Sequence, residues 1–146
     1  MAKEIDFPPV WLAGFAALCG AIGAAVPVHS EFNHTVGAVL VSFGLIVMAI
    51  AALQMLVART TVIPRRDPAA LVYGGIFRLS RNPIYLGDAI VLTGFCFSWD
   101  ALLALPLVAV FMWVIQTRFI RDEEARLAAH FGEQYEDYCA GTRRWL

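Results

Sequence analysis

Four long apolar stretches constrain this chain more than any other feature of its sequence. They cover residues 10–28, 36–58, 84–97 and 101–119. A helix needs about 20 apolar residues to cross a hydrocarbon layer of about 30 Å, so the first, second and fourth stretches can span a membrane. The third is short, and we expect it to thin the bilayer, to extend backwards over Leu79 and Ser80, or to pack as a hairpin with the fourth. The sequence therefore predicts an all-α polytopic membrane protein with about four transmembrane helices, which forms a single domain over residues 1–146.

The composition supports this interpretation, and the residue types argue against a protein that binds nucleic acid or a metal. Hydrophobic residues make up 60% of the chain and charged residues 16%, whereas a soluble domain is about 45–50% apolar and about 25% charged. A formal net charge of -1 gives no positive field of the kind that attracts nucleic acid, which excludes nucleic acid as a partner. The cysteines lack a CxxC spacing, and the histidines are divided between the two sides of the predicted membrane, so no metal site is expected.

The basic residues are confined to alternate segments between the apolar stretches. With four alternating spans, they fall before the first span, in the connecting loop 59–83, and from Arg118 through the tail 120–146. The other two loops contain no Lys or Arg. By the positive-inside rule, both termini and the loop 59–83 are cytoplasmic. We therefore expect an inner-membrane protein whose chemistry lies at its cytoplasmic face, among membrane lipids.

The junction between the loop and the third stretch contains candidate binding groups. Asn82 followed by Pro83 predicts a helix start, because an Asn side chain can accept a hydrogen bond from a free N–H of the first turn and proline needs no donor there. With Arg81 beside it, such a start can hold a carboxylate or a phosphate. A capped helix with an arginine that binds lipid headgroups explains the same residues.

An amphipathic helix is expected beyond the fourth stretch, over residues 121–131, with Gly132 at its end and a short helical piece after it. It carries Glu123 and Glu124. Adjacent carboxylates point about 100° apart on a helix, so we expect one to face a pocket while the other faces solvent or pairs with Arg118, Arg121 or Arg126. A charged helix face that is simply solvated explains the pair equally well.

Asp88 lies about one helical turn inside the third stretch. An ionised side chain is costly there, so we expect a partner such as Arg81 or Arg59, or a water-filled cavity. A carboxylate within a span also fits a small ion-coupled transporter, which is the alternative function. A third hypothesis, a non-catalytic membrane scaffold, predicts that the cytoplasmic loop tolerates substitution freely.

Four segments occur in the chain in a distinctive order. They are Leu71-Val-Tyr-Gly-Gly-Ile-Phe-Arg, Arg81-Asn-Pro-Ile-Tyr-Leu-Gly, Glu123-Glu-Ala-Arg-Leu and Phe131-Gly-Glu-Gln-Tyr-Glu-Asp-Tyr138. Together they resemble the isoprenylcysteine carboxyl methyltransferase family, and related patterns occur in membrane phospholipid N-methyltransferases. The resemblance covers about the C-terminal two-thirds of the chain, from near Thr60 to Trp145.

The resemblance implies transfer of a methyl group from S-adenosylmethionine to a lipophilic acceptor that enters from the bilayer. The acceptor is either an isoprenylcysteine-like carboxylate or a phospholipid amine. Arg81 and Glu123 are the implied catalytic residues and would supply charged contacts. The implied cofactor-binding residues are Leu71, Val72, Phe77, Arg81, Asn82, Pro83, Ile84, Tyr85, Glu123 and Glu124.

Three positions depart from the family pattern. Asn82 replaces a frequent histidine, Ile76 a frequent proline, and Phe77 a frequent tyrosine. Because Asn82 does not titrate, no histidine base is assigned here. An amine acceptor must lose a proton, and Glu123 or Glu124 is the candidate base. The enzyme hypothesis therefore requires that the start of the third stretch and the acidic tail helix meet on one side of the membrane and share a ligand.

Overall fold

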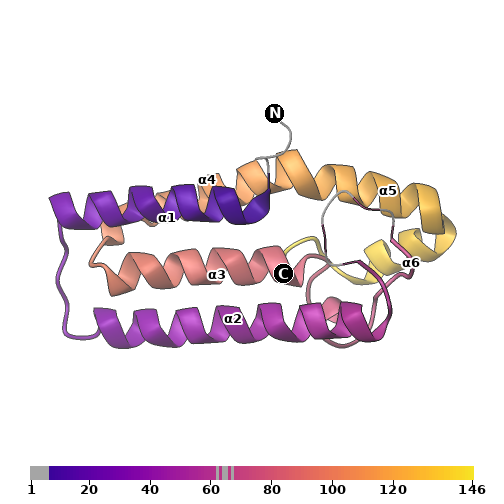
Figure 1. Cartoon of the computed structure of the whole chain (residues 1–146), viewed down its shortest axis with the longest axis horizontal. Coiled ribbons are helices and arrows are strands. Elements are labelled where there is room, and N and C mark those ends of the chain that lie inside the picture. The colour runs from indigo at the N-terminus through magenta and orange to yellow at the C-terminus, as the bar shows by residue number, and fades with distance from the viewer. Residues whose placement is uncertain (1–6, 62, 64–65, 67) are drawn as a thin grey trace.

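The computed structural model describes residues 7–61, 63, 66 and 68–146, and its regular elements are helices without any strand among these residues (Figure 1). In chain order they are α1 (Pro8–Ala25), α2 (Asn33–Val57), η1 (Gly75–Arg78), α3 (Pro83–Ser98), η2 (Leu102–Ala104), α4 (Pro106–Ile115), the π-helical segment η3 (Gln116–Ile120), α5 (Arg121–Phe131) and α6 (Glu133–Gly141). The expected all-α fold is confirmed.

Three helical segments are long and apolar enough to cross a membrane: α1, α2 and the continuous run Leu102–Phe131. The last of these differs from the prediction, which ended the fourth span at residue 119 and began a separate amphipathic helix. Instead, α4 continues through η3 into α5, because residues 116–131 contain neither Gly nor Pro to break the helix. The helix ends where expected, at Gly132, which has a φ of 52°.

The short helix α3 lies at the centre of the bundle, between α2 on one side and α1 and α4 on the other (Figure 1). All of its residues are described, and none is exposed. It does not extend over Leu79 and Ser80, which precede it in non-helical chain, and it packs more extensively on α2 than on α4. The structure therefore has a short helix that packs against α2, α1 and α4, and the expected thinning of the bilayer around it stays a prediction.

Glycines on α2 and α3 allow these two helices to approach closely. A Cβ added at Gly44 would lie 2.8 Å from the carbonyl oxygen of Gly87, and one added at Gly94 would lie 2.9 Å from that of Gly37. Real Cβ atoms are essentially never found within 3.0 Å of such an atom. The two glycine pairs therefore set the distance between α2 and α3, as small residues do in membrane helix packing.

The α1–α2 and α3–η2 connections are joined by a polar cluster at one end of the bundle. The Asn33 side chain donates to Asp100 Oδ1 at 2.7 Å, and Asp100 Oδ2 lies 2.7 Å from His29 Nδ1. The hydrogen bond from Asn33, with a further contribution from His29, lowers the pKa of Asp100. The backbone N–H of Val28 also donates to the Asp100 carbonyl at 2.8 Å.

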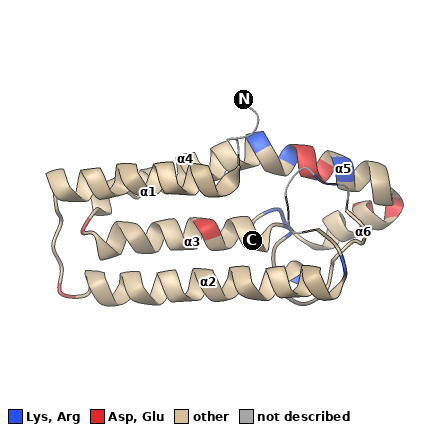
Figure 2. Cartoon of the chain, viewed as in Figure 1, with Lys and Arg blue, Asp and Glu red and all other residues tan. Residues whose placement is uncertain are grey.

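The charged residues are distributed unevenly along the bundle. Figure 2 shows the basic residues gathered at the end where α2 ends, α3 begins, and α5 and α6 lie. We call this the polar end. The opposite end carries acidic residues in its loops, and α3 carries a single charged residue, Asp88 (Figure 2). The uneven charge and the apolar helices agree with a multi-pass membrane protein.

Candidate active site

A cavity of about 330 Å³ opens at the polar end. Such a volume is at the lower end of the range for small-molecule sites. Its wall is formed by the start of α1, the second half of α2, the loop before α3, the first turns of α3, and α5 and α6. All ten cofactor-binding residues that the sequence predicts line it, namely Leu71, Val72, Phe77, Arg81, Asn82, Pro83, Ile84, Tyr85, Glu123 and Glu124.

Tyr85 and Glu123 form the link between α3 and α5. The Tyr85 hydroxyl donates to Glu123 Oε1 at 2.8 Å, although the two residues are separated by 38 positions in the chain. Tyr85 is buried, and both residues line the cavity. The geometric condition for a shared cleft between the start of the third stretch and the acidic helix is therefore met.

The start of α3 is held differently from the way its sequence predicts. Asn82 is the N-cap and Pro83 the first helical residue, but the Asn82 side chain makes no capping hydrogen bond. Its Nδ2 donates instead to the carbonyl oxygen of Arg144 at 3.0 Å, while its backbone N–H donates to Ser80 Oγ at 3.1 Å. The Asn82 side chain therefore ties the C-terminal tail to the start of α3 and does not cap the helix.

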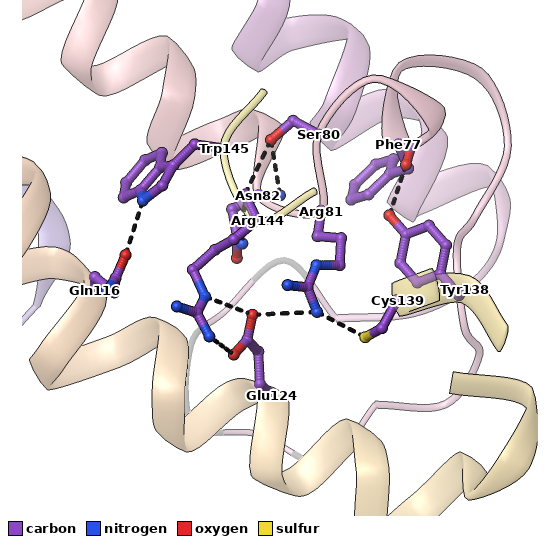
Figure 3. A network of polar contacts seen from close by, with 10 residues as sticks. All are labelled: Phe77, Ser80, Arg81, Asn82, Gln116, Glu124, Tyr138, Cys139, Arg144 and Trp145. Atoms are coloured by element: carbon purple, nitrogen blue, oxygen red, sulfur yellow. Dashed lines mark hydrogen bonds and ion pairs between the residues drawn. The ribbon is translucent and has the colours of Figure 1, made fainter. Parts of the chain in front are cut away.

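Glu124 is the centre of the ionic network drawn in Figure 3. Arg144 donates to both carboxylate oxygens, from Nε at 2.9 Å and from Nη2 at 2.7 Å. This hydrogen bonding raises the pKa of Arg144. Arg81 Nη1 lies 3.5 Å from Glu124 Oε1 and also donates to Cys139 Sγ. The expectation that one carboxylate of the pair would turn away from the pocket is wrong: both line the cavity, and Glu124 meets arginines from outside its own helix.

Two guanidinium nitrogens are left without a hydrogen-bond partner within the described part of the chain. They are Arg81 Nε and Arg126 Nη1, both buried, and both residues line the cavity. A buried donor without a partner costs free energy, about 1–3 kcal/mol in mutational data. An anion in the cavity would satisfy such donors, so these atoms indicate a site for a carboxylate or phosphate.

Aromatic side chains form much of the cavity wall. Tyr138 donates from its hydroxyl to the carbonyl oxygen of Phe77 at 2.6 Å, which attaches α6 to η1 (Figure 3). Phe77, Tyr135 and Tyr138 all line the cavity. Burial raises the pKa of both tyrosines, so each hydroxyl is protonated at neutral pH.

The sequence profile of a family described as phospholipid methyltransferase matches residues 32–134. This match covers more than half of the chain. The chain belongs to the phospholipid methyltransferase family. No curated protein and no solved structure matches it significantly. The resemblance seen in the sequence is thus confirmed at the level of this related group, and the protein is a membrane methyltransferase.

Family membership gives no support to the transporter hypothesis that Asp88 suggested. In this phospholipid methyltransferase family member, Asp88 is only 4% exposed and lines the cavity. No hydrogen bond or ion pair joins it to Arg81 or Arg59 among the residues described. We expected Asp88 either to pair with a charged residue or to face a cavity, and in the structure it faces a cavity.

Several cavity-lining or supporting residues were not among the predicted site residues. They are Asp88, Arg126, Tyr135, Tyr138 and Arg144. Arg126 follows Glu123 by three positions, so helical spacing alone could have placed it on the same face. No sequence spacing could have placed Arg144 at the site, because its contact with Glu124 depends on how the tail packs against the segment before α3.

Proposed function

We propose that the protein transfers a methyl group from S-adenosylmethionine to a lipophilic acceptor at the cytoplasmic membrane face. The observation that carries this proposal is the Tyr85–Glu123 hydrogen bond at 2.8 Å, which joins the two predicted halves of the site across one cavity. Membership of a membrane methyltransferase family supports the reaction type. When bound, S-adenosylmethionine supplies a methyl group on a positively charged sulfonium.

The donor set of the cavity fits this cofactor. The unpartnered Nη1 of Arg126 and Nε of Arg81 suit its carboxylate. Glu123 suits its ammonium group or ribose hydroxyls, and the faces of Phe77 and Tyr135 suit a sulfonium. We assign Arg81 and Glu123 as the catalytic contacts in this proposal, with Arg126 added as a cofactor-binding residue.

The role of this chain in methyl transfer is positioning and desolvation. Displacement at a methyl group needs the two reacting atoms in line and water excluded, and needs no covalent intermediate with the protein. A carboxylate acceptor of the isoprenylcysteine type requires no base, whereas a phospholipid amine must first lose a proton. Pro8, Pro9 and Met48 contribute apolar groups to the cavity wall, which suits a lipophilic acceptor that enters from the bilayer.

Cofactor binding tests the proposal directly. We expect S-adenosylmethionine to bind the detergent-purified protein in titration calorimetry, and Glu123→Gln or Arg126→Ala to weaken binding at least tenfold, since each removes one charged contact. Arg121→Ala is the matched control, because Arg121 is exposed on the same helix and does not line the cavity. Absence of binding heat for the wild type would refute the proposed cofactor.

The acceptor is identified by a second experiment. Membranes are incubated with the protein and cofactor carrying a labelled methyl group, and the labelled product is characterised. We expect label in a lipid or a lipidated molecule, as an ester if the acceptor is a carboxylate and as an alkaline-stable N-methyl group if it is an amine. Label found only in water-soluble molecules contradicts a lipophilic acceptor.

We also propose that the polar end faces the cytoplasm of the inner membrane, with both termini on that side. The concentration of arginines at this end supports the orientation (Figure 2). In a variant whose Cys139 is replaced by Ser, we expect Glu31→Cys to react with a membrane-impermeant maleimide on intact cells, and Asp122→Cys to react only after lysis. Both positions are exposed and lie at opposite ends of the bundle. The reverse labelling pattern would invert the orientation.

A further inference from the structure

Asp88 is a buried carboxylate that the proposed cofactor contacts do not use. Its residue is 4% exposed, it lines the cavity, and within the described residues it has neither a hydrogen bond nor an ion pair. It is also the single charged residue of α3 (Figure 2). An ionisable group inside a membrane protein is costly and usually marks a pathway or a binding function. Its free position on the cavity wall points to a ligand rather than to a structural partner.

The position of Asp88 separates it from the other charged residues of the cavity. It follows Tyr85 by three positions, which places it about 4.5 Å further along α3, away from the polar end. Arg81 precedes Tyr85, and Arg126 follows Glu123 on α5, which runs antiparallel to α3 (Figure 1). Both arginines are therefore displaced towards the polar end, whereas Asp88 lies on the membrane side of the Tyr85–Glu123 contact.

Two other helices contribute apolar groups to the cavity wall, and one of these groups lies close to Asp88. Pro8 at the start of α1 and Met48 in α2 line the same cavity, and Met48 contacts the position next to Asp88, Gly87. The cavity beside Asp88 thus combines an apolar side chain, Met48, with one carboxyl group. Such a combination suits a molecule with a hydrocarbon portion and a positively charged group, and disfavours one that would place a negatively charged group beside Asp88.

We propose that Asp88 binds the nitrogen of an amine acceptor and selects it against acceptors that carry a carboxylate. This inference rests on the proposed methyl transfer and assigns a residue to the acceptor side of the site. A nitrogen forms a bond to a methyl group only through a free electron pair, so an ammonium must first lose one proton. Transfer of that proton to Asp88 breaks one N–H bond, forms one O–H bond and leaves both partners neutral.

Binding of simple amphiphiles tests the selection without turnover. In neutral-detergent micelles, we expect the wild type to bind dodecylammonium at least tenfold more tightly than dodecanoate of the same chain length. Asp88→Asn, which keeps the shape and removes the charge, should abolish this preference. Asp122→Asn is the control, because Asp122 is exposed and does not line the cavity. Equal affinities in the wild type, or an unchanged preference in Asp88→Asn, would overturn the proposal.

Cofactor affinity distinguishes this inference from the proposed function. Asp88→Asn should bind S-adenosylmethionine as the wild type does, which also verifies that the variant is folded. A tenfold or larger loss of cofactor affinity in folded Asp88→Asn would place Asp88 in the cofactor site and overturn the assignment. If the wild type binds dodecylammonium selectively but binds no S-adenosylmethionine, the acceptor site stands and the proposed cofactor fails.

Turnover gives a third readout once an amine acceptor is identified. We expect Asp88→Asn to lower kcat for that amine at least tenfold in addition to raising its KM, because the variant cannot take the proton. Asp88→Glu should restore part of kcat, since it keeps a carboxylate in the cavity. A raised KM with unchanged kcat would overturn the proton-accepting part of the assignment.

Discussion

Glu123 and Glu124 are neighbours in the chain with different partners. Glu123 accepts a hydrogen bond from Tyr85 across the cavity, whereas Glu124 is held by Arg144 and Arg81. The 3.6-residue period explains this difference, because adjacent side chains point in different directions around α5. Glu123 therefore links α5 to α3, and Glu124 links α5 to the tail and to the segment before α3.

The contribution of Asp100 to the stability of the folded protein is expected to depend on pH. Hydrogen bonding to Asn33 lowers the pKa of Asp100 in the folded state. Its stabilising contribution is then complete above the ordinary carboxyl pKa of about 4 and is lost as the pH falls through the lower folded value. We expect the melting temperature of Asp100→Asn to lie below that of the wild type at pH 7.

The difference between the two melting temperatures should shrink as the pH falls below about 4. Glu31→Gln serves as the control, because Glu31 is exposed in the same region and its side chain has no described contact with this cluster. A difference that stays constant down to pH 3 would show that ionisation of Asp100 does not contribute.

Residue types and spacing located the candidate site but not all of its contacts. The Arg-Asn-Pro-Ile-Tyr segment and the Glu pair could be found from the sequence because each is a short continuous run of residues. The partner of Asn82 could not, since its amide contacts the carbonyl oxygen of Arg144, 62 positions away. Long-range side-chain contacts of this kind depend on the tertiary fold and leave no local pattern.

At the scale of elements, α2 and α3 pack through glycines that face each other. Gly94→Ala would place a Cβ 2.8 Å from the Val41 backbone nitrogen and 2.9 Å from the Gly37 carbonyl oxygen. Since backbone atoms cannot move aside cheaply, we expect a loss of about 1–3 kcal/mol of stability, measured as a lower melting temperature in detergent.

Gly14→Ala is the matched control for this substitution. Gly14 is also in a helix, but a Cβ there meets no other atom within 4 Å. We expect a neutral or slightly stabilising effect, because alanine has the higher helix propensity. Equal destabilisation by the two variants would mean that the α2–α3 distance is not set by the glycines.

The helices themselves were largely predictable, because apolar length and helix breakers both act locally. The continuation of α4 into α5 was not, since the change from apolar to charged residues near 120 looks like a boundary in the sequence. The backbone instead stays helical through the π segment Gln116–Ile120. Such segments often occur at functional sites, and this one immediately precedes the helix that carries Glu123.

At the scale of the whole molecule, the last residues of the chain join elements that are distant in sequence. The carbonyl oxygens of Arg143 and Arg144 accept from the segment before α3, and Trp145 Nε1 donates to Gln116 Oε1 at 2.9 Å (Figure 3). The tail therefore ties the start of α3 to the α4–α5 helix, and both of these carry cavity-lining residues.

Arg144→Ala tests the importance of this connection. It removes two hydrogen bonds to Glu124, a partly buried carboxylate, so we expect a loss of about 1–3 kcal/mol of stability and weaker cofactor binding. Thermal unfolding and calorimetry measure the two effects. Arg143→Ala is the control, because Arg143 is exposed and its described hydrogen bond, to Arg81 before α3, uses only its backbone carbonyl. If both variants behave alike, the Arg144 side chain is not needed.

The enclosed position of α3 has a consequence for biogenesis. A helix of 16 residues is about 24 Å long, shorter than the hydrocarbon layer, and this one also carries a carboxylate. Lipid alone is therefore a poor environment for it as it leaves the ribosome. Its neighbours α2 and α4 are synthesised before and after it, so α3 is enclosed on both sides only once α4 has been translated. Enclosure of this segment and assembly of the candidate cavity are thus expected to be one event.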